Sequence, residues 1–237
     1  MCQKCDSIKA FNFDDNQQKP PIISDDLSAA ILLLLWDDNT HNTMSVIRRE
    51  WDSKFTFNDK ALNELMKQMA RNHAQAAHLG RQRAGSNAPF GQSDLDFGKA
   101  IALQEKQYLE AMLKDIQANR YGPFDKDFNS KEVQAEIRKA EQRARLQSNK
   151  LIATANEAWV LTAGDKEKIY WNLSPFEEHC IDCPRIAAGS PYTKATLRQY
   201  PKDGQTQCIT NCLCWLTTES GAKSFVPQPV KKKGEKP

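Results

Sequence analysis

The sequence lacks a long hydrophobic run. Its most apolar stretch is Ala29–Trp36, "AAILLLLW". About eight residues fall far short of the roughly 20 that a membrane-spanning helix needs. The N-terminal residues also lack the apolar segment and the small-residue cleavage site of a secretory signal. We therefore expect no membrane span, and synthesis in a reducing cytoplasm.

Common catalytic motifs are also missing. There is no GxSxG elbow, no Walker-type phosphate loop and no glycine-rich dinucleotide fingerprint. His73 and His78 are five positions apart, so they do not share the helix face used by the two histidines of an HExxH zinc site. We interpret both as solvated or interface residues. The sequence favours a protein that is not an enzyme, and an enzyme that uses its thiols is the minor alternative.

The chain has little net charge, +3 over 237 residues, which does not by itself indicate nucleic-acid binding. Its basic residues are nevertheless unevenly placed. Residues 65–93 contain no acid, and residues 226–237 form a tail rich in proline and lysine that we expect to be disordered. The candidate nucleic-acid contacts are Lys67, Arg71, Arg81, Arg83, Lys231, Lys232 and Lys233.

Apolar residues at helical spacing predict a mainly helical first part. The expected helices cover residues 24–36, 59–84, 93–120 and about 130–163. Ser24 is the expected cap of the first helix, and Ser93 with Asp96 resembles a capping box for the third. The last helix, between Asn129 and Gly164, would be about three times the mean length, which predicts either a kink or a rod lying against partners.

The character of the sequence changes after Gly164. The segment 168–173, "KIYWNL", is typical of a short strand, and Pro201 to Gly204 predict the turn of a hairpin between two strand-like runs. The aromatic residues expected to form a small core are Trp171, Phe176, Tyr192, Tyr200 and Trp215. The predicted fold is α+β, with an extended arm (1–23), a helical domain (24–163), a zinc-binding β module (164–225) and the basic tail (226–237).

Cysteines are the clearest chemical signal. There are seven, an odd number, and clustered cysteines in a reducing compartment more often bind metal than form disulfides. Cys180 and Cys183 form a CxxC, whose spacing lets two thiolates of one turn bind a single tetrahedral ion. A second cluster follows. We expect one structural zinc bound by four of Cys180, Cys183, Cys208, Cys212 and Cys214, with Cys214 as the substitute for Cys212.

Other arrangements stay open at this point. An iron–sulfur centre, disulfides and free thiols are alternatives to zinc. His179 is interpreted as exposed or as supporting the site, not as a ligand. Cys2 and Cys5 repeat the CxxC spacing, but no histidine or cysteine follows them until His41, so a second zinc site there is a minor alternative.

Residues 155–217 resemble the C-terminal cysteine module of tailed-bacteriophage minor head proteins, the Mu F-like head morphogenesis family. The shared order is a Trp-containing strand (Trp171), the CxxC, a turn with Pro and Gly, and a terminal CxC (Cys212 and Cys214). Many relatives carry a His-Pro before the final cysteines and an Arg inside the CxC. This chain has Cys208 and Leu213 instead, so the resemblance implies that Cys208 takes the place of the histidine ligand.

The resemblance implies a structural component of the virion head near the portal or the inner capsid. Such a protein would contact portal or capsid proteins, act in head assembly and DNA packaging or retention, and be multimeric in the particle, with possible non-specific contact to packaged DNA. The alternative hypothesis is a cytoplasmic zinc-ribbon factor that binds nucleic acid through the basic residues named above.

Overall fold

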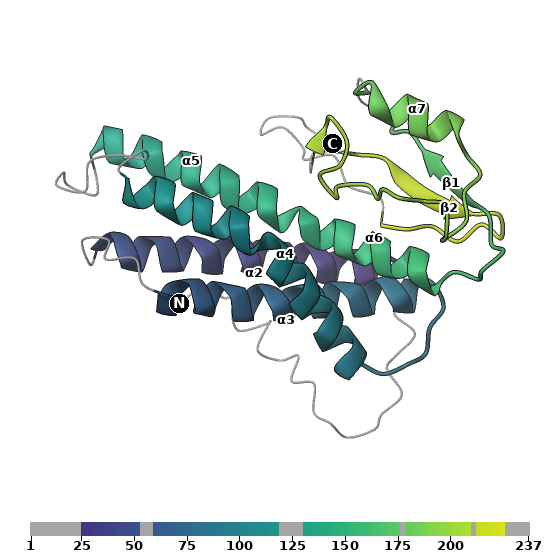
Figure 1. The fold of residues 1–237 in the computed structure, drawn as a ribbon, viewed down its shortest axis with the longest axis horizontal. Helices are drawn as coiled ribbons and strands as arrows, with labels where there is room; N and C mark the ends of the chain where they lie inside the picture. The colour runs from purple at the N-terminus through teal and green to yellow at the C-terminus, as the bar shows by residue number, and fades with distance from the viewer. Residues whose placement is uncertain (1–24, 53–58, 119–129, 176–178, 210–211, 226–237) are drawn as a thin grey trace.

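The computed structural model describes residues 25–52, 59–118, 130–175, 179–209 and 212–225. Helices α2 to α6 form an elongated bundle, and a small unit containing β1, α7 and β2 lies against α6 (Figure 1). The predicted α+β class is confirmed, since the chain is mainly helical with a small two-stranded antiparallel sheet.

Helix α2 spans Asp25–Asp52, more than twice the predicted length. The polar sequence after Trp36 suggested that the helix ends there, but Asn39, Thr40 and Thr43 are buried in the bundle. Their side chains find partners inside the protein, so the helix continues past them. The expected cap, Ser24, lies outside the described residues.

Helices α3 (Asp59–Arg83) and α4 (Gln92–Gln117) agree with the predicted ranges. Two glycines set how closely their neighbours approach. A Cβ atom on Gly80 would lie 2.0 Å from the carbonyl oxygen of Ala155, and one on Gly98 would lie 2.1 Å from that of Ala70. No larger side chain fits at either crossing without moving backbone.

The start of α4 corrects the expected capping box. The Asp94 side chain, not that of Asp96, accepts the backbone N–H of Gly91 at 3.0 Å. The Ser93 hydroxyl instead accepts from Arg81 at 3.1 Å. The bond from a side chain back to the start of the helix is therefore made two residues before the predicted pair, by the fully buried carboxylate of Asp94.

The long fourth helix is broken into α5 (Lys131–Ser148) and α6 (Lys150–Thr162), which is the kinked alternative. Ser130 caps α5 by accepting the N–H of Val133 at 3.3 Å, whereas Asn129 lies outside the described residues. At the other end the chain leaves α6 in extended backbone at Ala163 (φ −58°, ψ 151°).

A buried polar layer surrounds the break. Trp36 donates its indole N–H to Asn149 Oδ1 at 2.9 Å, and the Ser148 hydroxyl accepts from Asn39 (2.9 Å) and Thr40 (2.8 Å). Asn72 of α3 donates to Asn39 Oδ1 at 3.0 Å. Side chains bonded at the junction account for the kink and tie three helices together in one register.

Strand β1 (Ile169–Asn172) pairs antiparallel with β2 (Trp215–Thr218), so that Ile169 lies opposite Thr218. The first predicted strand is confirmed. The hairpin around Pro201–Gly204 is wrong, because no strand flanks that turn. Asp203 accepts the backbone N–H groups of Tyr200 (2.7 Å) and Gln205 (2.8 Å), so a side chain takes the place of a partner strand. A short helix, α7 (Asp182–Ala188), lies between the strands in sequence.

The core of the cysteine module extends into the bundle. Its buried members are Trp159, Val160, Ile169, Trp171, Cys183, Leu197, Cys212, Cys214 and Leu216. Among the predicted aromatic core residues, Trp171 belongs to this cluster, Tyr192 and Tyr200 pack against it, and Trp215 is half-buried outside it. Phe176 lies outside the described residues. Because Trp159 and Val160 come from α6, helix and module share one core.

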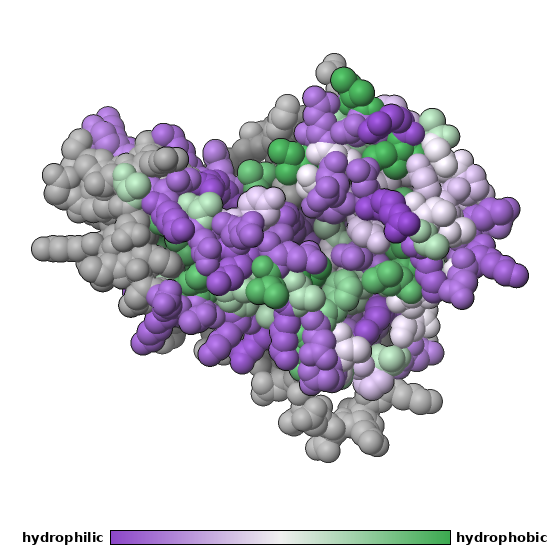
Figure 2. All heavy atoms as spheres, viewed as in Figure 1, coloured by the Kyte–Doolittle hydropathy of each residue, from purple (hydrophilic) through white to green (hydrophobic). Residues whose placement is uncertain are grey.

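The face of the molecule in Figure 2 is largely hydrophilic, with separate apolar patches over the helices and the cysteine module. Across the described ranges, the structure contains no helix long and apolar enough to cross a membrane.

Candidate metal centre

Three chain segments bring the five C-terminal cysteines together. Cys180 precedes α7 and Cys183 lies in its first turn, while Cys208 ends the loop that follows the Asp203 turn. Cys212 and Cys214 lead directly into β2. Because β2 pairs with β1, the sheet places the CxC beside the CxxC.

The sulfur atoms are closely spaced. Cys180 Sγ lies 3.4 Å from both Cys183 Sγ and Cys208 Sγ, and Cys183 Sγ lies 3.6 Å from Cys208 Sγ and 3.7 Å from Cys212 Sγ. Cys183, Cys212 and Cys214 form a second triad whose sulfurs all lie within 4.8 Å of one another. Cys183 therefore belongs to both triads and is the central thiol of the cluster.

None of the five thiols is in a disulfide. Their sulfur separations are far longer than the roughly 2.05 Å of an S–S bond. Cys183, Cys212 and Cys214 are buried, and Cys180 and Cys208 are half-buried. The cluster is thus a mostly enclosed, all-sulfur donor set, which suits a thiophilic metal ion.

Two residues clamp the cysteine loops to each other. The backbone N–H of Ile181 donates to Gln207 Oε1 at 3.3 Å, and the backbone N–H of Gln207 donates to Asp182 Oδ2 at 2.8 Å. Thr206 places its hydroxyl 3.2 Å from Cys208 Sγ. These polar contacts hold the thiols in position from outside the cluster, the usual role of groups that surround metal ligands.

The acidities of the thiols reflect their crowding. Burial followed by the charge of Cys212 raises the pKa of Cys183, and a hydrogen bond with Cys214 followed by burial raises the pKa of Cys212. Burial also raises the pKa of Cys208, to about 11. At Cys180 burial acts in the same direction but is outweighed by hydrogen bonds from Cys183 and Cys208, which lower its pKa to about 7. Several thiolates can coexist here only if a cation offsets their charge.

One histidine is placed as we expected and two are not. His179 is exposed beside the cluster. His73 and His78 are buried, so their interpretation as solvated residues is wrong. His73 Nδ1 lies 2.7 Å from the Thr154 hydroxyl, and burial lowers the pKa of His73 from 6.5 to about 3. His78 lies 3.5 Å from Asp94 and packs edge-on against Phe90.

The described candidate nucleic-acid contacts differ in how available their charged groups are. Arg81 forms an ion pair with the buried Asp94, and Arg83 donates to the carbonyl of Lys223 at 2.7 Å and stacks over Phe225. Lys67 and Arg71 are exposed on α3. Lys231, Lys232 and Lys233 lie outside the described residues, as do Cys2 and Cys5.

Sequence reasoning found the five thiols but missed Asp182 and Gln207. Each binds a backbone group of the other loop, and no motif signals such a contact. A match to known proteins would be the other route to such residues, but no protein-family model, curated protein or solved structure matches this chain.

Proposed function

We propose that this chain is a structural component of a tailed-phage virion head, whose C-terminal module is held together by one zinc ion. The observation that carries the proposal is the convergence of five cysteine sulfurs inside a small module packed on the helical bundle. The metal site and the biological setting rest on different arguments.

The sulfur spacing fits a tetrahedral ion. Four thiolates at the usual Zn–S distance of roughly 2.3 Å are about 3.8 Å apart. Four of the six separations among Cys180, Cys183, Cys208 and Cys212 are 3.4 to 3.7 Å, slightly shorter than that edge. Cys212 lies within 4.8 Å of Cys183 and Cys214 as one triad, and Cys180 and Cys208 form the other triad with Cys183. These four cysteines are the proposed ligands, and Cys214 is the fifth thiol, within reach of Cys212.

A site filled by four thiolates leaves no open position for water, which is the arrangement of structural zinc. The module has little regular structure of its own, since its sheet has two strands of four residues each and part of its core comes from α6. Structural zinc contributes an apparent free energy on the order of 10 kcal/mol in small peptides at neutral pH. Zinc would therefore act as the staple of the module and take no part in chemistry.

Paired substitutions test the ligand set. We expect Cys212→Ser to lower the zinc content of the purified chain, and Cys214→Ser to leave it at the wild-type level. Both replacements remove one buried sulfur close to Cys183, so they are matched in size and place. Loss of zinc with Cys214→Ser, and not with Cys212→Ser, would reverse the assignment.

The phage setting is supported by the order of elements in the resemblance. A helix, the strand of Trp171, the CxxC, a turn and the CxC follow one another and lie in one unit in this chain. We propose that the helical bundle packs on portal or capsid proteins and that the stapled module is a rigid docking unit. The test is mass spectrometry of purified particles, in which the chain should be present at low copy number. Its absence from particles would contradict the proposal.

The second candidate, a zinc-ribbon factor that binds nucleic acid, is favoured by the exposed Lys67 and Arg71 on α3. It is weakened by Arg81 and Arg83, whose cationic groups already bind Asp94, Phe225 and the Lys223 carbonyl. Tight DNA binding by the purified chain that falls steeply with added salt would favour this candidate.

A further inference from the structure

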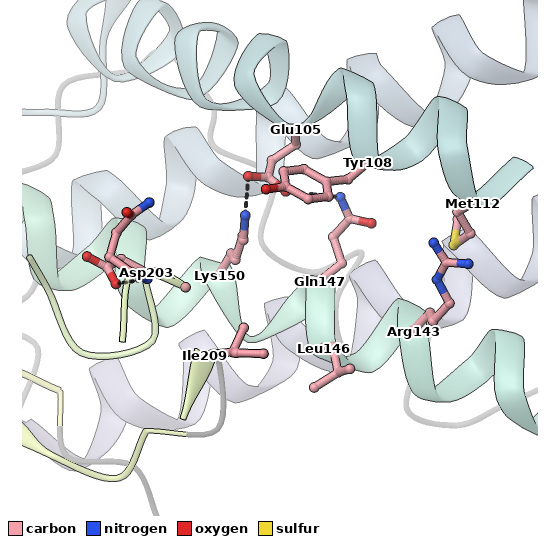
Figure 3. A pocket seen from close by; sticks show the side chains of 11 residues that line it. Glu105, Tyr108, Met112, Arg143, Leu146, Gln147, Lys150, Asp203 and Ile209 are labelled. Atoms are coloured by element: carbon pink, nitrogen blue, oxygen red, sulfur yellow. Dashed lines mark hydrogen bonds and ion pairs between the residues drawn. The ribbon is translucent and has the colours of Figure 1, made fainter. Parts of the chain in front are cut away.

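A hollow of about 260 Å³ lies where the bundle meets the loop that carries Cys208 (Figure 3). Helices α4, α5 and α6 supply one side, and Asp203, Gly204, Gln205 and Ile209 supply the other. Its volume is below the roughly 300 Å³ at which small-molecule sites begin. One or two protein side chains are a better match to its size.

The rim of the hollow is apolar and exposed. Tyr108 of α4 is 64% exposed, Leu146 of α5 is 40% exposed and Ile209 of the loop is 56% exposed. Figure 3 shows these three side chains around the same space, contributed by three different parts of the chain. An exposed aromatic ring beside aliphatic groups is typical of the energetically important centre of a protein interface.

Ile209 is the least expected of the three. Its backbone is in the left-handed region, with φ 51°. A β-branched residue rarely adopts that conformation, so the backbone is strained at this position. Strain of this kind concentrates at binding sites. In this chain the strained residue, Ile209, exposes a large apolar side chain to solvent and directly follows Cys208, a proposed metal ligand.

The charged groups around the hollow are two carboxylates, Glu105 and Asp203, and two cations, Arg143 and Lys150. Glu105 binds the Lys150 ammonium at 2.5 Å and accepts from Gln147 at 3.3 Å, so this pair is internally satisfied. Asp203 lies at the other wall, and its pKa is raised by burial. Arg143 pairs with Asp115 and Lys150 with Glu105, whereas Asp203 forms no ion pair among the described residues. A cationic group from outside would therefore be favoured beside Asp203.

The same molecule carries a matching pair of side chains on α7. Ile181 is 79% exposed, and the Arg185 side chain is 75% exposed although it touches Asp182 at 3.0 Å. Both have helical geometry and are four residues apart, so they project from one face of the short helix. An apolar group next to a cation is what the apolar rim and Asp203 would accept.

We propose that two copies of this chain form a two-fold dimer in which Ile181 of each copy enters the hollow of the other and Arg185 faces Asp203. The geometry favours reciprocal exchange. The backbone N–H of Ile181 donates to the Gln207 side chain, and Gln207 is two residues before Ile209. The face of α7 that carries Ile181 and Arg185 therefore lies beside the hollow on the same molecule. When a projecting group and its complementary hollow lie side by side on one molecule, a two-fold axis lets each copy place its group in the hollow of the other, so the same contact forms twice. The dimer does not depend on the phage setting.

The test is the mass of the zinc-loaded full chain in solution, measured by light scattering or sedimentation from about 1 to 100 µM. The wild-type chain should be a dimer within this range. Ile181→Asp and Leu146→Lys should each raise the dissociation constant at least tenfold. When these two variants are mixed, one contact is wild type and the other pairs opposite charges, so dimers should reappear. A wild-type monomer at 100 µM, or no recovery on mixing, overturns the proposal.

Two further variants separate binding from folding. Ile209→Asn relieves the left-handed strain, because asparagine tolerates that conformation, yet it removes part of the apolar rim. We therefore expect the Ile209→Asn variant to keep its stability and zinc content but to dimerise more weakly. Unchanged dimerisation would overturn the role of the rim. Leu103→Glu is the matched control at an exposed leucine of α4 that does not line the hollow. It should dimerise as the wild type does, and its failure to do so would contradict the assigned surface.

Discussion

The helical bundle is stabilised by long helices in close contact, whereas the cysteine module has two four-residue strands, one short helix and many turns. In the bundle, apolar side chains, close glycine contacts and a buried polar layer act together over four helices. In the module, three thiols are part of the buried core and two more pack against it. The interior of the first region is filled by its own side chains, and that of the second contains cysteines that could hold a metal ion.

This difference makes the two regions fail in different ways. A substitution in the bundle should lower the free energy of unfolding gradually, by an amount that depends on how many contacts it removes or displaces. Loss of one ligand in the module should remove most of its stabilisation at once. The substitutions below test this contrast, beginning with the largest expected effect.

The largest effect is expected from Cys183→Ser, because Cys183 contacts both sulfur triads. Loss of a ligand should forfeit most of a metal contribution on the order of 10 kcal/mol, so the module should unfold. The fluorescence of Trp159 and Trp171, both buried in its core, should shift to the red. Far-UV circular dichroism should retain most of the helical signal. Unchanged fluorescence would show that the module folds without its central thiol.

An acid-dependent effect of about 3 kcal/mol at pH 4 is expected from His73. Its pKa is about 3 in the folded chain and near 6.5 when unfolded. Between pH 6.5 and pH 3, His73 is therefore protonated in the unfolded chain but neutral in the folded chain, which favours unfolding. The free energy of unfolding should be unaffected by His73 above pH 6.5 and should fall as the pH drops from 6.5 towards 3.

The His73→Leu variant should lose less stability than the wild type over that pH range. Urea unfolding followed at 222 nm, at pH 7 and at pH 4, measures the difference. Other titrating groups, including the thiols, are common to both chains and cancel in the comparison. Equal acid sensitivity of the two chains would mean that His73 is not the buried neutral group described above.

A loss of about 2 kcal/mol is expected from Gly80→Ala, since the added methyl group would meet the Ala155 carbonyl at 2.0 Å. Helices α3 and α6 would have to move apart. Gly91→Ala is the control, because the nearest atom to its Cβ is 3.9 Å away. Thermal unfolding of the helical signal should fall clearly for the first variant and little for the second. Similar melting of both would argue against a close crossing at Gly80.

The smallest effect is expected at the helix caps. Ser130→Ala removes the hydroxyl that accepts from Val133 and should cost about 1 kcal/mol. Ser93→Ala should change stability by less than about 0.5 kcal/mol, because Ser93 is itself exposed and its hydroxyl accepts from the half-buried Arg81 side chain without capping the helix. Chemical denaturation distinguishes the two. A larger loss at Ser93 would restore the capping box that the sequence suggested.

Local patterns explain which parts of the fold could be predicted. Helices α3 and α4 follow from apolar residues such as Leu62, Leu65 and Met69, which repeat at helical spacing and are buried. The extension of α2 could not be foreseen in this way. Asn39 and Thr40 look like surface residues until Ser148, more than 100 residues later, supplies their partner.

The sheet was predictable in one strand only. Trp171 lies in a segment of strand-like composition, but its partner Leu216 is far away in sequence, and the register depends on tertiary packing. The strand-like run before Pro201 had no partner strand, because Asp203 bonds its backbone instead. The cysteine cluster was foreseen from spacing alone, since a CxxC followed by further cysteines needs only a turn between them to converge.

The metal content of the chain tests the central claim most directly. The full-length protein, purified without added metal and analysed by native mass spectrometry with elemental analysis, should carry one zinc ion per chain. Removal of that ion by a chelator should unfold the module. A wild-type chain that holds no metal and keeps Trp159 and Trp171 buried, or one that binds two ions, would contradict a module stapled by four thiolates around a single zinc.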